Sequence, residues 1–152
     1  MNNNTSLLPH LPVAHLLTQG TSGPGLLGSK CSQCGEMYFP ATDSCTACCG
    51  SDLAPCDIGN QGRLWSWTVQ AFLPKAPYDS GETESDFQPY GVGYVQMPSG
   101  VKVESRLTTA DPAELAIGMP MVLCLVRYGQ RVDGQPLQTF AFAPTIEIEG
   151  DL

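Results

Sequence analysis

The sequence predicts an all-β protein in which a small metal-binding module precedes a five-stranded antiparallel barrel. Three observations support this fold class. Four of the seven cysteines form two closely spaced pairs in the first third of the chain. Five short segments rich in β-branched and aromatic residues follow them, separated by turn-forming residues. No stretch of about ten residues has the spacing of apolar side chains that a helix requires.

These features divide the 152 residues into four parts. Residues 1–27 are rich in Asn, Thr, Gly and Pro, and we expect an N-terminal arm that is flexible or ordered by a partner. The metal-binding module is expected at 28–56 and the barrel at 57–145, with a C-terminal tail at 146–152.

The two cysteine pairs predict a tetrahedral metal site. They occur in the motifs Cys31-Ser-Gln-Cys34-Gly35 and Cys45-Thr-Ala-Cys48. This spacing is typical of structural Zn²⁺, whose four coordination positions are filled by cysteine sulfur with none left for a substrate.

The fourth ligand and the metal have alternatives. Cys49 follows Cys48 directly and could replace it, although the two-residue spacing favours Cys48. Four thiolates can also hold rubredoxin-type iron, and a single pair could perform thiol redox chemistry. A closed set of four cysteines without a redox partner favours structural zinc.

The barrel strands are predicted from alternation and from turn residues. The sequence Pro98-Ser-Gly100 is expected to form the hairpin turn between the second and third strands. A short helical turn is expected at 111–118. The predicted strands are 63–73, 90–97, 101–107, 119–127 and 137–142.

Charge and composition restrict the partners and the location. Seven Lys and Arg residues against 15 Asp and Glu residues give a net charge of −8, which disfavours binding to a nucleic-acid backbone. A membrane-spanning helix needs about 18 consecutive apolar residues, and no apolar run in the sequence is that long. The first residues do not have the pattern of a signal peptide. Metal-binding cysteines then indicate a reducing, cytoplasmic location.

Residues for acid–base catalysis are scarce. Both histidines, His10 and His15, lie in the N-terminal arm, so the barrel has no Ser–His or Cys–His pair. The acidic residues between positions 79 and 86 fall in a loop rich in Gly, Pro and Ser, where we expect them to be solvated. We therefore expect no chemistry from the isolated chain.

The order of the motifs resembles a bacterial and archaeal family that couples a rubredoxin-like zinc ribbon to an OB-fold barrel. The similarity covers residues 26–145 and includes the cysteine pairs and Phe39-Pro40. It continues through Gly62-Arg-Leu-Trp-Ser-Trp-Thr68, Pro89-Tyr-Gly-Val-Gly-Tyr-Val95, Ile117-Gly-Met-Pro-Met-Val122 and Phe140-Ala-Phe-Ala-Pro144. The resemblance implies that the barrel is an OB-fold.

The resemblance also implies a function, because members of this family are partners of thiolases and related acyl-CoA enzymes. It implies a structural Zn²⁺ and a thiolase-like catalytic subunit, with two copies of each subunit. This chain would help to bind coenzyme A or acyl-CoA while the partner cleaves or forms a C–C bond.

Coenzyme A carries phosphates and an adenine, so basic and aromatic residues near the junction of the two modules are candidates for contacts with CoA or with the partner. Alternation places Trp65 and Trp67 on one strand face. The candidates are Lys30, Tyr38, Phe39, Arg63, Trp65, Trp67 and Lys75.

Two other functions fit parts of the sequence. Small barrels of this kind can bind single-stranded nucleic acid by base stacking, although the acidic composition opposes it. An iron-loaded cysteine site would make a rubredoxin-like electron carrier.

Overall fold

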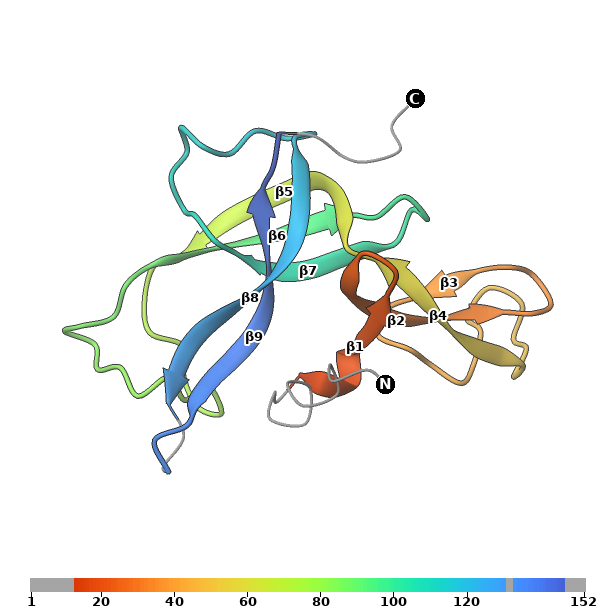
Figure 1. Cartoon of the computed structure of the whole chain (residues 1–152), viewed down its shortest axis with the longest axis horizontal. Coiled ribbons are helices and arrows are strands. Elements are labelled where there is room, and N and C mark those ends of the chain that lie inside the picture. Colours follow the sequence, from red (N-terminus) through yellow and green to blue (C-terminus); the bar gives the residue numbers. More distant parts are fainter. Residues whose placement is uncertain (1–12, 131–132, 147–152) are drawn as a thin grey trace.

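The computed structural model describes residues 13–130 and 133–146 and shows two β-structures packed together (Figure 1). A four-stranded sheet, the ribbon, precedes a closed five-stranded barrel. The elements are η2 (Ala14–Leu16), β1 (Leu17–Gly20), β2 (Gly23–Cys31), β3 (Met37–Tyr38), β4 (Leu53–Gly59), β5 (Gln61–Gln70), β6 (Tyr90–Gln96), β7 (Lys102–Leu107), β8 (Pro120–Gln130) and β9 (Pro136–Pro144). Within this part of the chain, no helix has the length and apolar character needed to span a membrane.

Strand β2 is the central strand of the ribbon. It pairs antiparallel with β1 and β3 along one edge and with β4 along the other. Leu17 on β1 lies opposite Leu26 on β2, and both side chains are buried. Apolar burial and the β1–β2 hairpin therefore order the N-terminal segment from Val13 onward.

This corrects the predicted boundary of the arm. The prediction took the composition of residues 1–27, glycines included, as a sign of an arm that is flexible or ordered by a partner, whereas the structure places residues 17–27 in a hairpin within the chain. The carboxylate of Asp57 on β4 comes so close to Gly20 and Gly25 that a Cβ at either position would clash with it. Close backbone approach, rather than flexibility, explains these glycines. Residues 1–12 of the predicted arm and 147–152 of the predicted tail lie outside the described residues.

The barrel closes in the order β5-β6-β7-β9-β8. Four of its pairings are antiparallel, as predicted, and β7 pairs parallel with β9 to close the barrel. The predicted turn at 98–100 is present, with Gly100 donating its N–H to the carbonyl of Met97 at 2.8 Å. The OB-fold prediction is confirmed.

A β-bulge changes the expected orientation of the two tryptophans. Leu64 lies opposite Val95 and Ser66 lies opposite Tyr94, so Trp65 is an extra residue on β5. The extra residue shifts the alternation of side chains by one position. Trp65 is consequently 50% exposed, while Trp67 is partly buried against the core. The prediction that they share one strand face is wrong.

The ribbon and the barrel share one hydrophobic core. Leu26 and Ile58 of the ribbon belong to the same cluster of buried side chains as Leu64, Met97 and Phe142 of the barrel. At its edge the ring of Phe39 meets that of Phe140 edge to face, with centroids 6.1 Å apart. Packing therefore fixes the ribbon against the barrel.

Candidate metal centre and ligand-binding surfaces

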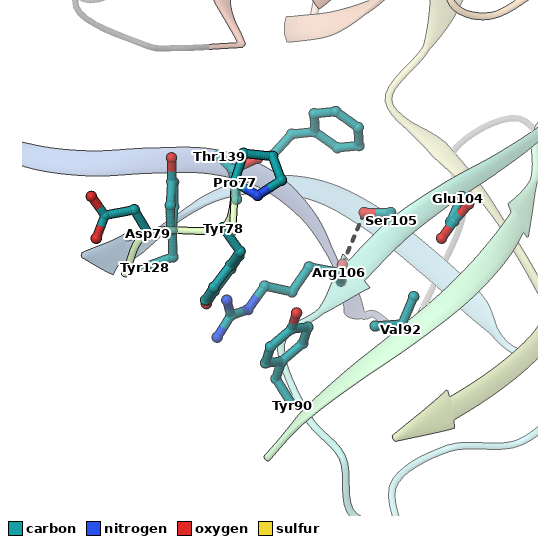
Figure 2. Close-up of a pocket in the computed structure, with 11 residues that line it drawn as sticks. Pro77, Tyr78, Asp79, Tyr90, Val92, Glu104, Ser105, Arg106, Tyr128 and Thr139 are labelled. Carbon is teal, nitrogen blue, oxygen red and sulfur yellow. Dashed lines mark hydrogen bonds between the residues drawn. The ribbon is translucent and has the colours of Figure 1, made fainter. Parts of the chain in front are cut away.

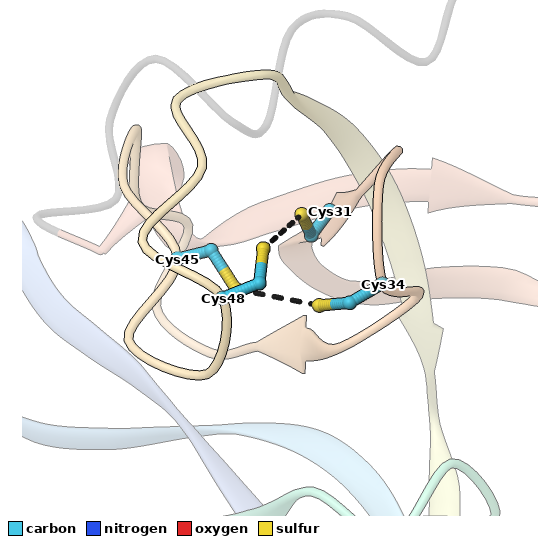
Figure 3. A group of neighbouring side chains, drawn as sticks. All are labelled: Cys31, Cys34, Cys45 and Cys48. Carbon is cyan, nitrogen blue, oxygen red and sulfur yellow. Dashed lines mark hydrogen bonds between the residues drawn. The ribbon is translucent and has the colours of Figure 1, made fainter.

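The four predicted cysteines meet at one end of the ribbon (Figure 3). The sulfurs of Cys31, Cys34, Cys45 and Cys48 all lie within 4.8 Å of one another. Two of the separations are 3.7 Å, from Cys31 to Cys48, and 3.5 Å, from Cys34 to Cys45. A tetrahedral Zn²⁺ with Zn–S distances of about 2.3 Å holds its sulfurs about 3.8 Å apart. The spacing of the donors therefore fits zinc.

Two tight turns present these sulfurs. In the first, the N–H of Gly35 donates to the carbonyl of Cys31 at 2.9 Å; in the second, the N–H of Cys49 donates to the carbonyl of Cys45 at 2.9 Å. Gly35 has a φ of 81° and Cys49 a φ of 62°, so both are left-handed. Cys49 thus occupies the position that glycine has in the first turn, and the sulfur that joins the cluster is that of Cys48.

Tyr38 on β3 contacts the cluster directly. Its hydroxyl lies 3.2 Å from the sulfur of Cys45 and accepts a hydrogen bond from the N–H of Thr46 at 3.0 Å. This hydroxyl contact is the main cause that lowers the pKa of the Cys45 thiol to about 6. The hydroxyl thereby favours the thiolate, which is the form that binds a metal.

Crowding of the sulfurs has the opposite effect on Cys48. A backbone hydrogen bond from Gly50 favours its thiolate, but the neighbouring sulfurs, first of all that of Cys34, outweigh it and raise the pKa of Cys48 to about 12. Four adjacent thiolates repel one another, and a divalent cation among them offsets that repulsion. The donor set is therefore suited to a metal ion.

The structure separates the other predicted site residues. Trp65 is exposed on the outer side of the barrel, where the ammonium group of Lys102 lies 4.4 Å from its ring centre. Arg63 donates to the carbonyl of Gly118 at 3.1 Å. Lys30 is exposed on β2, and Lys75 is exposed in the 71–89 loop between β5 and β6. These residues do not form one site.

Tyr38 and Phe39 line a cleft between the ribbon and the β6–β7 hairpin. The cleft has a volume of about 440 Å³, and Val101 and Lys102 form its barrel side. Of the seven predicted contact residues, these two share a cavity. The Tyr38 hydroxyl, however, points to the metal cluster.

A larger pocket lies on the barrel and contains none of the predicted residues (Figure 2). It has a volume of about 500 Å³. Its wall includes three tyrosines, Tyr78, Tyr90 and Tyr128, together with Arg106. These side chains come from the 71–89 loop and from β6, β7 and β8, so no short motif identifies them. The sequence offered one signal for this pocket, which is Tyr90 at the start of β6, directly after the long 71–89 loop.

Comparison with known proteins gives the family. The model of the ChsH2 rubredoxin-like zinc ribbon domain matches residues 24–54, and that of the ChsH2 C-terminal OB-fold domain matches residues 57–126. A DUF35 domain-containing scaffold protein of Methanothermobacter thermautotrophicus is 33% identical over 122 residues, which cover 78% of this chain and 86% of that protein. The chain belongs to the DUF35 scaffold family.

Other members of the DUF35 scaffold family are parts of enzymes. The benzoylsuccinyl-CoA thiolase subunit BbsA of Thauera aromatica is 27% identical over 126 residues, covering 78% of this chain and 76% of BbsA. A chain of the solved Ltp2-ChsH2(DUF35) aldolase has the same fold, with a TM-score of 0.59, 24% identity and coverage of 80% of this chain and 86% of that one.

Proposed function

We propose that this chain is a non-catalytic, zinc-binding subunit of a thiolase-type acyl-CoA enzyme. It binds a thiolase-like catalytic subunit, with two copies of each chain in the complex. There it supports binding of CoA or acyl-CoA while the partner cleaves or forms a C–C bond. A subunit of a benzoylsuccinyl-CoA thiolase is the specific assignment that we propose to test first.

The similarity to BbsA carries this proposal. It extends over 78% of the chain and includes both the ribbon and the barrel. The composition supports a role without chemistry, because neither histidine falls within the barrel segment 57–145. A thiolase partner supplies its own nucleophile and base. The family relationship and the composition therefore favour an accessory role.

The metal has a structural part in this proposal. Cys31, Cys34, Cys45 and Cys48 would hold Zn²⁺ and leave no position for a substrate. When bound, the ion cross-links the two turns of the ribbon and so supplies folding energy. Because the ribbon shares its core with the barrel, the folding energy from the metal also supports the ribbon residues that pack against the barrel.

Trp65 is the predicted contact residue best placed to meet a partner. Half of its surface is exposed, and its ring packs edge to face on Tyr94, which is itself 40% exposed. Exposed aromatic residues are enriched at protein interfaces. Tyr38 and Phe39, in the cleft next to the ribbon, remain candidates for contact with CoA or with the partner, whereas the partly buried Trp67 has a role in packing.

Affinity purification of the tagged chain from its native cells, followed by mass spectrometry, tests the proposal. We expect a stoichiometric thiolase-like protein and a 2:2 mass by light scattering. The purified pair should cleave acyl-CoA in a CoA-dependent reaction that neither chain performs alone. Turnover by the rigorously pure single chain would contradict the accessory role. Co-purified nucleic acid or protein-bound iron would instead favour one of the other two functions.

A further inference from the structure

The pocket in Figure 2 lies on the ligand-binding face that OB-folds use as a class. That face is formed by the second and third barrel strands and by the loops after the first and fourth strands. Here these strands are β6 and β7, and the pocket is lined from the 71–89 loop as well as from both of them. Its volume of about 500 Å³ is within the range of about 300–1,000 Å³ found for small-molecule sites.

The wall of this pocket consists of flat side chains. The rings of Tyr78 and Tyr90 are inclined by 23°, with centroids 6.4 Å apart, and Tyr128 lies 6.3 Å from Tyr78. The guanidinium carbon of Arg106 lies 4.0 Å from the ring centre of Tyr90. Phenol rings and guanidinium groups are the surfaces on which nucleic-acid bases stack in proteins.

The 71–89 loop is held in place by packing. Ser80 is buried against β8, and a Cβ at Gly129 would lie 2.7 Å from the carbonyl oxygen of Ser80. Tyr78, two residues earlier, contacts both Tyr90 and Tyr128. The wall contributed by the loop is thus formed in the free chain, which lowers the entropy cost of binding.

The charges select a neutral ligand that donates hydrogen bonds. Two carboxylates, Asp79 and Glu104, line the pocket beside the single cation Arg106. A phosphate in the pocket would face a net negative charge. A planar base with an exocyclic amine can instead donate to a carboxylate while its ring stacks.

We propose that this pocket binds an adenine ring, with any attached phosphates directed toward solvent. This proposal rests on the proposed function, because the adenine would be that of the CoA used by the complex. It assigns recognition of that ring to Tyr78, Tyr90 and Arg106, and recognition of its amine to one of the two carboxylates that line opposite ends of the pocket, Asp79 or Glu104. The predicted contacts at the ribbon junction are then not needed to hold the base.

Titration of the full chain with adenosine, followed by amide shifts in ¹H–¹⁵N spectra, tests this directly. We expect saturable shifts at Val92, Ser105 and Arg106. Inosine, which lacks the exocyclic amine, should bind at least 3-fold more weakly, and inorganic phosphate should cause no shifts at these amides. Adenosine 3′,5′-bisphosphate should gain less than 3-fold in affinity over adenosine, because its phosphates stay outside the pocket.

Variants identify the pocket as the site. Tyr90→Leu and Arg106→Gln should each weaken adenosine binding at least 5-fold. Replacing both Asp79→Asn and Glu104→Gln should reduce the preference for adenosine over inosine to less than 2-fold. Phe72→Leu is the matched control: Phe72 belongs to the same loop, is 74% exposed and does not line the pocket, so binding should not change. Arg106→Gln provides the test if Tyr90→Leu loosens the fold.

The proposal is overturned if adenosine does not saturate, if shifts are spread over the surface, or if Phe72→Leu weakens binding as much as Tyr90→Leu. If the amide shifts at the pocket appear on addition of a purified partner protein but not of adenosine, the pocket binds a side chain of the partner. That result would also overturn the proposal. Failure of adenosine binding beside a co-purifying thiolase-like protein would leave the accessory function standing. Saturable adenosine binding in the absence of a co-purifying thiolase-like protein would contradict the accessory function and support the adenine site.

Discussion

The hydroxyl oxygen of Tyr38 lies 3.2 Å from the sulfur of Cys45. The same oxygen accepts the N–H of Thr46 at 3.0 Å, and the Thr46 hydroxyl also lies 3.2 Å away, where it can donate to the tyrosine oxygen and leave the tyrosine proton for the sulfur. Partners of this type orient metal ligands and adjust their basicity. Tyr38, predicted as a residue for CoA or interface contacts, therefore supports the metal centre through its hydroxyl and offers only its ring to the neighbouring cleft.

We predict that Tyr38→Phe weakens zinc binding about 10-fold without unfolding the chain. Loss of the hydroxyl raises the pKa of Cys45, which the hydroxyl now lowers to about 6. Since the thiolate binds the metal, zinc should be released at a higher pH on acidification than in the wild type. Competition with a chromophoric chelator over a pH series measures both effects. Tyr94→Phe, which removes an exposed hydroxyl on the barrel, should change neither value.

Cys48 and Cys49 provide a matched pair of variants at adjacent positions. We predict that Cys48→Ser loses bound zinc, whereas Cys49→Ser retains one zinc per chain, because the Cys48 sulfur belongs to the cluster. Cys49→Gly should also keep zinc and raise the free energy of unfolding by about 0.5 to 1 kcal/mol, since glycine accepts a φ of 62° without strain. Zinc analysis of purified variants and chemical denaturation measure these outcomes. Retention of zinc by Cys48→Ser with loss by Cys49→Ser would reverse the assignment.

The sequence predicted the strands of the barrel better than the orientation of their side chains. Alternation and turn residues located all five strands, and cysteine spacing located the metal cluster. The bulge at Trp65 was invisible, because pairing with β6, and not a local pattern, inserts the extra residue. Trp65 and Trp67 were therefore both predicted to contact CoA or the partner from one strand face, although their side chains lie on different faces of β5.

This difference predicts unequal effects of two similar substitutions. Trp67→Ala should lower the free energy of unfolding by about 2 to 3 kcal/mol, because the ring packs against the core. Trp65→Ala should cost less than about 1 kcal/mol, because half of its surface is exposed. Urea denaturation of both variants measures the contrast. Equal losses of stability would mean that both rings are buried and that the bulge is absent.

The pocket was missed for a different reason. Tyr78, Tyr90, Arg106 and Tyr128 are spread over 51 positions of the sequence and converge only when β6, β7, β8 and the 71–89 loop assemble. Each of them alone is an ordinary surface residue in the sequence. The hairpin at the N-terminus was missed because its glycines, which allow close contact with Asp57, are also typical of flexible segments. Both the pocket and the hairpin depend on contacts between residues that are far apart in the sequence.

Metal removal should destabilise the barrel as well as the ribbon. Leu26 and Ile58 extend the ribbon into the core that contains Met97 and Phe142, so a ribbon without metal exposes part of the barrel core. We predict that Cys34→Ser abolishes zinc binding and lowers the Tm of the chain by about 10 °C or more. Cys124→Ala, at a partly buried cysteine of β8 outside the cluster, should retain zinc and most of the stability. Hydrogen exchange after chelation should accelerate first at residues 23–59 and then at β5 and β6, and zinc should reverse both changes. Faster exchange confined to the ribbon would show that the two modules fold independently.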